Sequence, residues 1–163
     1  MAVTAIHLLR HAHAGDPIKW SGSDFDRPLS AKGRDQMARL GSLLALTGFS
    51  PDVIVASPRL RAVETAELLA GRLGVRSRTD VRMADSLSLS VVEQILVDAG
   101  DPARPLLVGH DPDFSELLAL LTGALDIPMR KGALARIDAE RPLQPGSGTL
   151  RWLLPPELVP DLG

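Results

Sequence analysis

The sequence contains no cysteine and few aromatic residues. Its 163 residues include no Cys and no Tyr, and aromatic residues make up 3% of the chain. The absence of cysteine excludes disulfides, zinc–thiolate sites and thiol nucleophiles. The chain also offers few rings for stacking on nucleic-acid bases, and its formal net charge of -2 does not favour a duplex-binding surface. We therefore expect no nucleic-acid partner, and any anion-binding site must be local.

Long apolar runs are also missing. No run approaches the ~20 residues that a membrane-spanning helix needs. Residues 1–13 have no cationic stretch ahead of their apolar part and no small-residue cleavage pattern, so they do not resemble a signal peptide. We expect a cytoplasmic protein with no membrane partner. The length fits one domain, which we expect to span residues 1–163.

The apolar pattern predicts alternating strands and helices. Short apolar runs predict strands, and apolar residues three or four positions apart predict helices. Strands are expected at 5–10, 52–57, 104–109, 132–137 and 148–154, and helices at 31–48, 58–74, 91–100 and 111–123. Residues 75–90 fit a short edge strand and a loop, and 155–163 fit an irregular tail. This order predicts an α/β fold, a three-layer sandwich whose central, mostly parallel sheet is flanked by helices.

Such a sheet predicts where a ligand binds. Ligands of parallel sheets bind outside the carboxyl ends of the strands. Arg10 and His11 follow the first expected strand, residues 57–61 (SPRLR) follow the second, and His110 follows the third. Two histidines and several arginines from distant parts of the sequence are therefore expected to converge.

The segment after the second strand has the features of an anion site. Ser57 is a good N-cap and Pro58 suits the first helical position, so a helix N-terminus with free N–H groups should start here. Arg59 and Arg61 then lie in the first turn, where a cation opposes the helix dipole unless an anion is bound. The alternative is a solvated helix start with salt-bridged arginines.

The histidines allow a metal interpretation. His11, His13 and His110 could share a zinc ion, because His-x-His at a strand end occurs in metal-dependent hydrolases. A binuclear site would need a further histidine where Pro17 stands. The metal interpretation is therefore weakly supported.

Covalent catalysis is the other interpretation. His11 would attack phosphorus while Arg10, Arg61 and His110 hold the phosphoryl oxygens, and no metal or cofactor would be needed. Arginine suits this task because its planar fork binds two phosphate oxygens. Since only an unprotonated ring nitrogen can attack, we expect the other nitrogen of His11 to donate to a backbone carbonyl.

Three segments resemble the signatures of the histidine phosphatase superfamily. They are LLRHAHAGD (8–16), SPRLRAVETAELL (57–69) and LLVGHDPDFSELLALL (106–121). The resemblance implies a phosphoglycerate mutase-like fold in which His11 becomes phosphorylated and Arg10, Arg61 and His110 form the phosphate pocket.

Further stretches resemble the SixA-like branch of that superfamily. They are RHAHAGD, RPLSAKGRDQ and the C-terminal KGALARI and GTLRWLL. This resemblance implies phosphohistidine in a protein as the substrate. The phosphatase domain that accompanies some MutT-type Nudix hydrolases has a similar first loop, but this chain has no Nudix portion.

The proton donor is less clear from the sequence. In larger members of the superfamily an acidic residue after the third strand supplies the proton, and Asp85 matches that position best. Asp16 in the first loop is a competitor, and Ser57 is a further candidate for substrate contact. An aspartate in such a context is also commonly a turn or cap residue.

The first loop carries other polar residues without an evident task. His13 either lines the pocket or is an ordinary loop histidine. Lys19, Trp20 and Arg27 are expected to lie in a solvated loop rather than against the substrate.

Substrate size is the last open point. The segment between residues 75 and 104 is short, so we expect a shallow, open site. Such a site admits either a phosphorylated protein or a small phosphate ester, such as a nucleotide or sugar phosphate. A non-catalytic phosphate-recognition module is the alternative of another class, although all four residues for catalysis are present.

Overall fold

The computed structural model describes residues 3–163. Within them the chain forms six strands: β1 (Val3–Arg10), β2 (Val53–Ala56), β3 (Ser77–Thr79), β4 (Pro105–Gly109), β5 (Leu134–Glu140) and β6 (Gly148–Leu154). The four α-helices are α1 (Ala31–Leu46), α2 (Leu60–Leu73), α3 (Leu89–Asp98) and α4 (Asp113–Thr122). Short 3-10 helices are η1 (Asp24–Asp26), η2 (Val81–Ala84) and η3 (Pro156–Leu158). The expected order of strands and helices is confirmed, including the short edge strand β3.

The six strands form one mixed sheet in the order β3-β2-β4-β1-β5-β6. The first four of these run parallel to one another, whereas β5 is antiparallel to both β1 and β6. The parallel part is built from strand–helix–strand units, and β5 and β6 form a hairpin, which needs no crossover helix. The sheet is thus mostly parallel, as expected.

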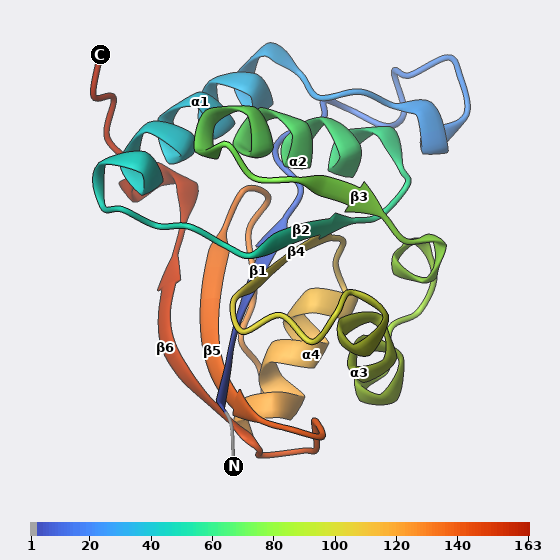
Figure 1. Cartoon of the computed structure of the whole chain (residues 1–163). Helices are drawn as coiled ribbons and strands as arrows, with labels where there is room; N and C mark the ends of the chain where they lie inside the picture. Colours follow the sequence, from blue (N-terminus) through green and yellow to red (C-terminus); the bar gives the residue numbers. More distant parts are fainter. Residues whose placement is uncertain (1–2) are drawn as a thin grey trace.

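Helices cover both faces of this sheet (Figure 1). Successive strand residues point to opposite faces, so Leu8 and Leu9 lie in different apolar clusters. One cluster joins α1 and α2 to the sheet through side chains such as Leu9, Met37, Leu40, Ile54 and Leu69. The other joins α3 and α4 to the opposite face through Leu8, Val55, Ile95, Phe114 and Leu118. The predicted three-layer sandwich is confirmed.

Some element ends differ from the prediction. Ser30 caps α1 as expected, since its Oγ accepts a hydrogen bond from the Gly33 N–H at 3.1 Å. Strand β5 begins at Leu134 rather than at residue 132, because Gly132 has a φ of +82° and lies in a turn. The irregular tail contains one short helical turn, η3.

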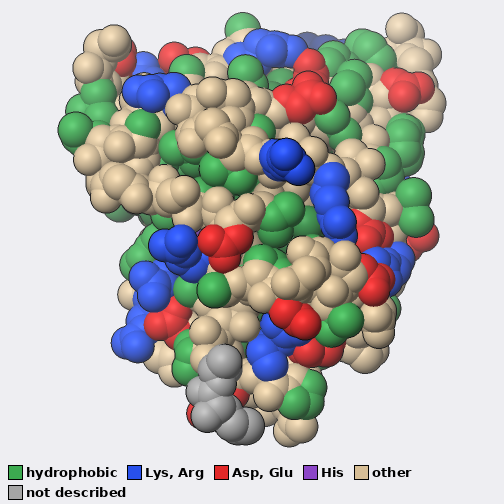
Figure 2. Space-filling view, in the orientation of Figure 1, with side chains coloured by type: hydrophobic (Ala, Val, Ile, Leu, Met, Phe, Trp, Pro, Cys, Tyr) green, Lys and Arg blue, Asp and Glu red, His purple; other side chains and the backbone are tan. Residues whose placement is uncertain are grey.

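Charged side chains of both signs are mixed with apolar ones on the face shown in Figure 2. Neither sign dominates that face. No helix in residues 3–163 is long and apolar enough to cross a membrane.

Candidate active site

The sheet register places His11 beside His110. Arg10 at the end of β1 pairs with Gly109 at the end of β4, and the N–H of His11 donates to the Gly109 carbonyl at 2.9 Å. The ring centroids of His11 and His110 are 5.3 Å apart. A Cβ on Gly109 would lie 2.6 Å from the Phe114 ring, so this strand end requires glycine. The predicted convergence of the two strand ends is confirmed.

His11 is held as a neutral imidazole with one free nitrogen. Its Nδ1 lies 2.8 Å from the carbonyl oxygen of Ala12. Because a carbonyl can only accept, Nδ1 carries the proton and Nε2 keeps its lone pair, as expected from the sequence. The residue is only 4% exposed. Burial lowers the pKa of His11 to about 3, and the charges of His110, Arg61 and Arg10 act in the same direction.

Ser57 binds His110 instead of capping a helix. Its Oγ lies 2.7 Å from Nε2 of His110 and accepts the N–H of Arg59 at 3.3 Å. The predicted N-cap at Ser57 and the helical position of Pro58 are therefore wrong: helix α2 begins at Leu60, with Arg59 as an N-cap that makes no side-chain bond. The Ser57 hydroxyl, which was predicted to cap the helix, is instead bonded to His110 at the end of the neighbouring strand β4.

The arginines in this segment face a carboxylate of the same chain. Arg61 donates from Nη1 to the Asp24 carbonyl at 2.8 Å and from Nη2 to the Asp24 carboxylate at 3.2 Å. The same carboxylate lies 3.6 Å from Nη1 of Arg59. The negative partner of these arginines in the structure is thus Asp24 in η1, which agrees with the alternative of salt-bridged arginines at this helix start. Sequence reasoning missed Asp24, and the unbalanced charge in the first turn of α2 was the one signal that could have suggested it.

Arg27 corrects another expectation. It is buried rather than solvated, with 7% exposure. Its Nη1 donates to the Ala14 carbonyl at 2.8 Å and its Nε to the Asp24 carboxylate at 3.1 Å. A guanidinium can reach a carbonyl and a carboxylate at once, so Arg27 joins Ala14 and Asp24 across the first loop. Lys19 is exposed and Trp20 is 37% exposed, as expected for a loop.

Thr65 links the strand end to the helix that carries Arg61. Its hydroxyl donates to the Arg61 carbonyl at 2.7 Å and accepts the N–H of Ala12, next to His11, at 3.1 Å. The residue is fully buried. Sequence reasoning did not single it out, although it lies within the quoted segment SPRLRAVETAELL.

Several buried nitrogens at this site have no hydrogen-bond partner. In residues 3–163 such side-chain atoms are Arg10 Nε, Arg61 Nε, His110 Nδ1 and His7 Nδ1. The first three belong to the residues predicted to surround His11. His7 lies midway along β1 against Phe49 and Trp152, away from the strand end. An unpaired buried polar group costs about 1–3 kcal/mol, so three around one imidazole point to a ligand with several acceptor oxygens.

A cavity of about 420 Å³ opens beside His110. Its walls are Asp24, Arg59, Arg61, Ala84, Asp85, Ser86, His110, Asp111, Pro112 and Asp113. The structure therefore brings Asp85 to the site. Asp16 is not among these residues, and its carboxylate accepts the N–H of Ile18 at 2.9 Å in an exposed turn. His11 does not line the cavity either and is buried, so the site is less open than expected at this histidine.

Asp113 is a carboxyl group that the sequence did not point out. It lines the same cavity as Asp85, at the start of α4. Burial raises the pKa of Asp113, and the neighbouring carboxylates of Glu116 and Asp111 add to this effect. A raised pKa favours the protonated form that a proton donor needs.

The metal interpretation receives no support. The Nδ1 of His13 lies 2.6 Å from the Ser30 hydroxyl. Across the part of the chain that the structure describes, residues 3–163, no three His, Cys, Asp or Glu side chains are placed to hold a metal ion. His11, His13 and His110 thus do not form a zinc site.

The buried histidines predict a pH-dependent stability. Burial lowers the pKa of His7 and of His110 to about 4 and that of His11 to about 3, all below the ordinary value of 6.5. As the pH falls below 6.5, the unfolded chain therefore binds protons that the folded chain does not. The contribution of these histidines to the free energy of unfolding is fully present above pH 6.5. It is lost as the pH falls toward 4, by about 1.4 kcal/mol per pH unit for each histidine.

Urea unfolding at pH 7, 6 and 5 checks this expectation. Carboxylates of ordinary pKa titrate little in that range, and Asp113, whose pKa is raised, changes the stability in the opposite direction, so a fall toward pH 5 reports the histidines. The free energy of unfolding should fall steadily toward pH 5. A constant value between pH 7 and pH 5 would show that these histidines are not buried as neutral groups.

Comparisons with known proteins agree with this geometry. The sequence profile of the histidine phosphatase superfamily (branch 1) matches residues 6–88. An uncharacterized protein of Picosynechococcus sp. is 34% identical over 114 residues, which are 68% of each chain. The phosphohistidine phosphatase SixA of Escherichia coli is 27% identical over 157 residues, which are 93% of each chain.

A solved structure shares the fold. The structure of the protein histidine phosphatase SixA complexed with tungstate superimposes with a TM-score of 0.81 at 23% identity, over 94% of this chain and 97% of that one. The sequence region matched by the family profile contains the strand end that bears His11. The chain therefore belongs to the histidine phosphatase superfamily (branch 1), and its fold is that of the SixA structure.

Proposed function

We propose that this chain removes the phosphoryl group from phosphohistidine in a protein, with His11 as the nucleophile. The observation that carries the proposal is the set of unpartnered buried nitrogens of Arg10, Arg61 and His110 around a neutral His11. Phosphoryl transfer requires mainly an aligned nucleophile and positive charge around the equatorial oxygens. Arg61 can meet this need without leaving Asp24, because Asp24 engages only its Nη atoms and leaves Nε free.

The reaction proceeds in two displacements. In the first, the lone pair on Nε2 of His11 attacks phosphorus, the P–N bond of the substrate breaks, and the departing imidazole takes up a proton. In the second, water attacks the phosphorus on His11 and the P–Nε2 bond breaks. This step releases inorganic phosphate, and a proton from the water passes to solvent. Arg10 and Arg61 balance the charge of the phosphoryl group in both steps.

Asp113 and Asp85 are the candidates for proton donation to the leaving group. Both line the cavity beside His110, and burial raises the pKa of Asp113. A departing imidazole is a better leaving group than an alkoxide, so it depends less on a strong general acid. A phosphohistidine substrate therefore suits a site in which Asp85 and Asp113 line a cavity that His11 itself does not line.

Two observations support a protein substrate. The chain between β3 and β4 holds only η2 and α3, so no insertion covers the cavity beside His110. The SixA relative, which covers nearly the whole chain, is named a phosphohistidine phosphatase. A solvent-facing cavity of this kind admits a phosphorylated side chain on a folded protein.

Phosphate release from a panel of substrates tests the proposal. The chelator-treated protein is incubated with a phosphohistidine-bearing carrier protein, nucleotide monophosphates, sugar phosphates and p-nitrophenyl phosphate. We expect kcat/KM for the phosphohistidine protein to exceed the others by about two orders of magnitude, the scale of discrimination that substrate contacts supply. Chelation should leave the rate unchanged.

Other results would point elsewhere. Preference for a nucleotide or sugar phosphate would make the chain a small-molecule phosphomonoesterase. Binding of the phosphorylated protein without phosphate release would indicate a recognition module. Loss of activity with chelator would contradict the metal-independent mechanism.

A further inference from the structure

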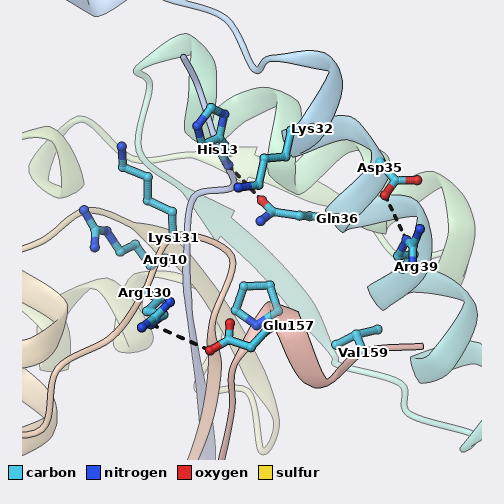
Figure 3. Close-up of a pocket in the computed structure, with 11 residues that line it drawn as sticks. Arg10, His13, Lys32, Asp35, Gln36, Arg39, Arg130, Lys131, Glu157 and Val159 are labelled. Carbon is cyan, nitrogen blue, oxygen red and sulfur yellow. Dashed lines mark hydrogen bonds and ion pairs between the residues drawn. The ribbon is translucent and has the colours of Figure 1, made fainter. Parts of the chain in front are cut away.

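A second cavity shares Arg10 with the proposed phosphate pocket (Figure 3). It has a volume of about 540 Å³ and lies between α1, the segment before β5 and η3. Its walls are Arg10, His13, Lys32, Asp35, Gln36, Arg39, Arg130, Lys131, Pro156, Glu157 and Val159. We call it the lysine groove. Apart from Arg10, none of these residues has a part in the reaction described above.

The groove is cationic at the end next to Arg10. The chain has three lysines, and two of them, Lys32 and Lys131, line this cavity. The groove arginines are neutralised: Arg39 pairs with Asp35 at 2.8 Å, and Arg130 lies 3.7 Å from Glu157. Neither lysine forms an ion pair with any residue in 3–163. A chain of net charge -2 thus concentrates two uncompensated cations beside its phosphate pocket.

Two further groups are fixed along this cationic end. The amide oxygen of Gln36 accepts the N–H of His13 at 3.0 Å, which leaves the amide NH₂ free to donate into the groove (Figure 3). The Nδ1 of His13 is bonded to Ser30, so Nε2 is the ring nitrogen available to a ligand. A Cβ on Gly33 would lie 2.0 Å from the His13 carbonyl oxygen, so glycine lets α1 pack directly against this loop.

The shape of the groove fits an extended polypeptide. Lys32 and Arg39 are seven positions apart on α1, which is about 10 Å along the helix axis. About three residues of extended chain cover that length. Apart from the His13 ring, no aromatic side chain lines the groove, so it offers little stacking surface for a nucleotide base. Its cationic end and neutral remainder instead match a chain segment that carries a carboxylate near the phosphorylated residue.

We propose that the lysine groove binds a carboxylate of an acidic segment that adjoins the phosphohistidine of the substrate protein, with Lys32 and Lys131 as its main contacts. This inference rests on the proposed function, because it assigns the groove to the same substrate. Burial lowers the pKa of Lys131, and so do the charges of Arg10, Arg27 and Arg61, which agrees with an amine that has cations rather than a carboxylate around it. The substrate would extend from His11 past Arg10 to the two lysines.

Charge reversal in the groove tests the proposal with two matched peptides. One carries a histidine flanked by two glutamates on each side, the other has glutamines in their place, and both are chemically phosphorylated on the histidine. In the Lys32→Glu/Lys131→Glu protein, kcat/KM for the acidic peptide should fall about ten-fold or more, since like charges then face each other. The rate on the glutamine peptide should stay within about two-fold of wild type. Equal losses on both peptides, or no loss on either, would overturn the proposal.

The third lysine supplies a control, and peptide binding separates this proposal from the proposed function. Lys19→Glu makes the same charge change on the exposed first loop and should leave both rates unchanged.

If wild type releases no phosphate from either peptide, the proposed function fails. Binding of the fluorescently labelled, unphosphorylated acidic peptide then tests whether the lysine groove binds an acidic segment. The wild-type protein should bind the acidic peptide more tightly than the glutamine peptide, and the Lys32→Glu/Lys131→Glu protein should not. Equal binding of both peptides by the wild-type protein would refute the proposal for the groove.

Discussion

Replacement of His11 by alanine is expected to reduce kcat by about four orders of magnitude or more and to abolish any covalent phosphoenzyme. The reason is that His11 has the unprotonated ring nitrogen at the centre of the site: Nδ1 is fixed on the Ala12 carbonyl and burial keeps the ring neutral. His110 is not expected to substitute, because its Nε2 is bonded to Ser57 and its Nδ1 is assigned here to hold a phosphoryl oxygen. Steady-state phosphate release together with gel or mass detection of phosphoprotein checks the prediction.

His7 offers a matched control for this experiment. It is another buried histidine and lies within β1, where it packs against Phe49 and Trp152 rather than at the strand end. His7→Asn should retain turnover after correction for any loss of folded protein, measured by circular dichroism. Substantial phosphate release by folded His11→Ala protein would disprove the nucleophile assignment.

Arg61→Lys should lower kcat/KM by about 10²–10³-fold, the effect of removing one preorganised donor to a developing charge. Arg61 uses both Nη atoms on Asp24 and leaves Nε for a phosphoryl oxygen. Lysine has a single nitrogen, so it cannot hold Asp24 and also donate from the position of Nε. Kinetics on the preferred substrate, with folding confirmed by thermal unfolding, measure the loss.

Arg104→Lys is the matched control for that variant. Arg104 pairs with Asp52 at 3.3 Å before β4, on the exposed surface and away from the cavity. The same chemical change there should leave kcat/KM within about two-fold of wild type, as expected for an exposed ion pair. A loss of only a few fold for Arg61→Lys would mean that this guanidinium does not hold the phosphoryl group.

The part of the site that the sequence could predict is the part that the parallel sheet imposes. Once β1 and β4 are recognised as parallel neighbours, their carboxyl ends must meet at one edge. The residues that follow, His11 and His110, then come together whatever the loops do. The tautomer of His11 also followed from chemistry alone, because a nucleophilic imidazole needs its second nitrogen fixed.

The loop contacts could not be predicted in the same way. Asp24 reaches Arg61 from 37 positions away, and nothing in the periodicity of the first loop marks either Asp24 or Arg27 as buried. Ser57 has the residue type and position of an N-cap, but its hydroxyl lies within reach of His110 and binds there. Local sequence rules cannot foresee such competition, since it depends on which group from another strand end lies nearest.

Trapping the phosphorylated protein during turnover tests the central claim most directly. The protein is mixed with its phosphohistidine substrate, quenched within milliseconds under alkaline conditions that preserve phosphorus–nitrogen bonds, digested and examined by mass spectrometry. We expect one transient phosphate, on His11, which forms and decays at rates that account for kcat. Turnover without phosphate on His11, or phosphate on another residue, would contradict covalent catalysis by this histidine.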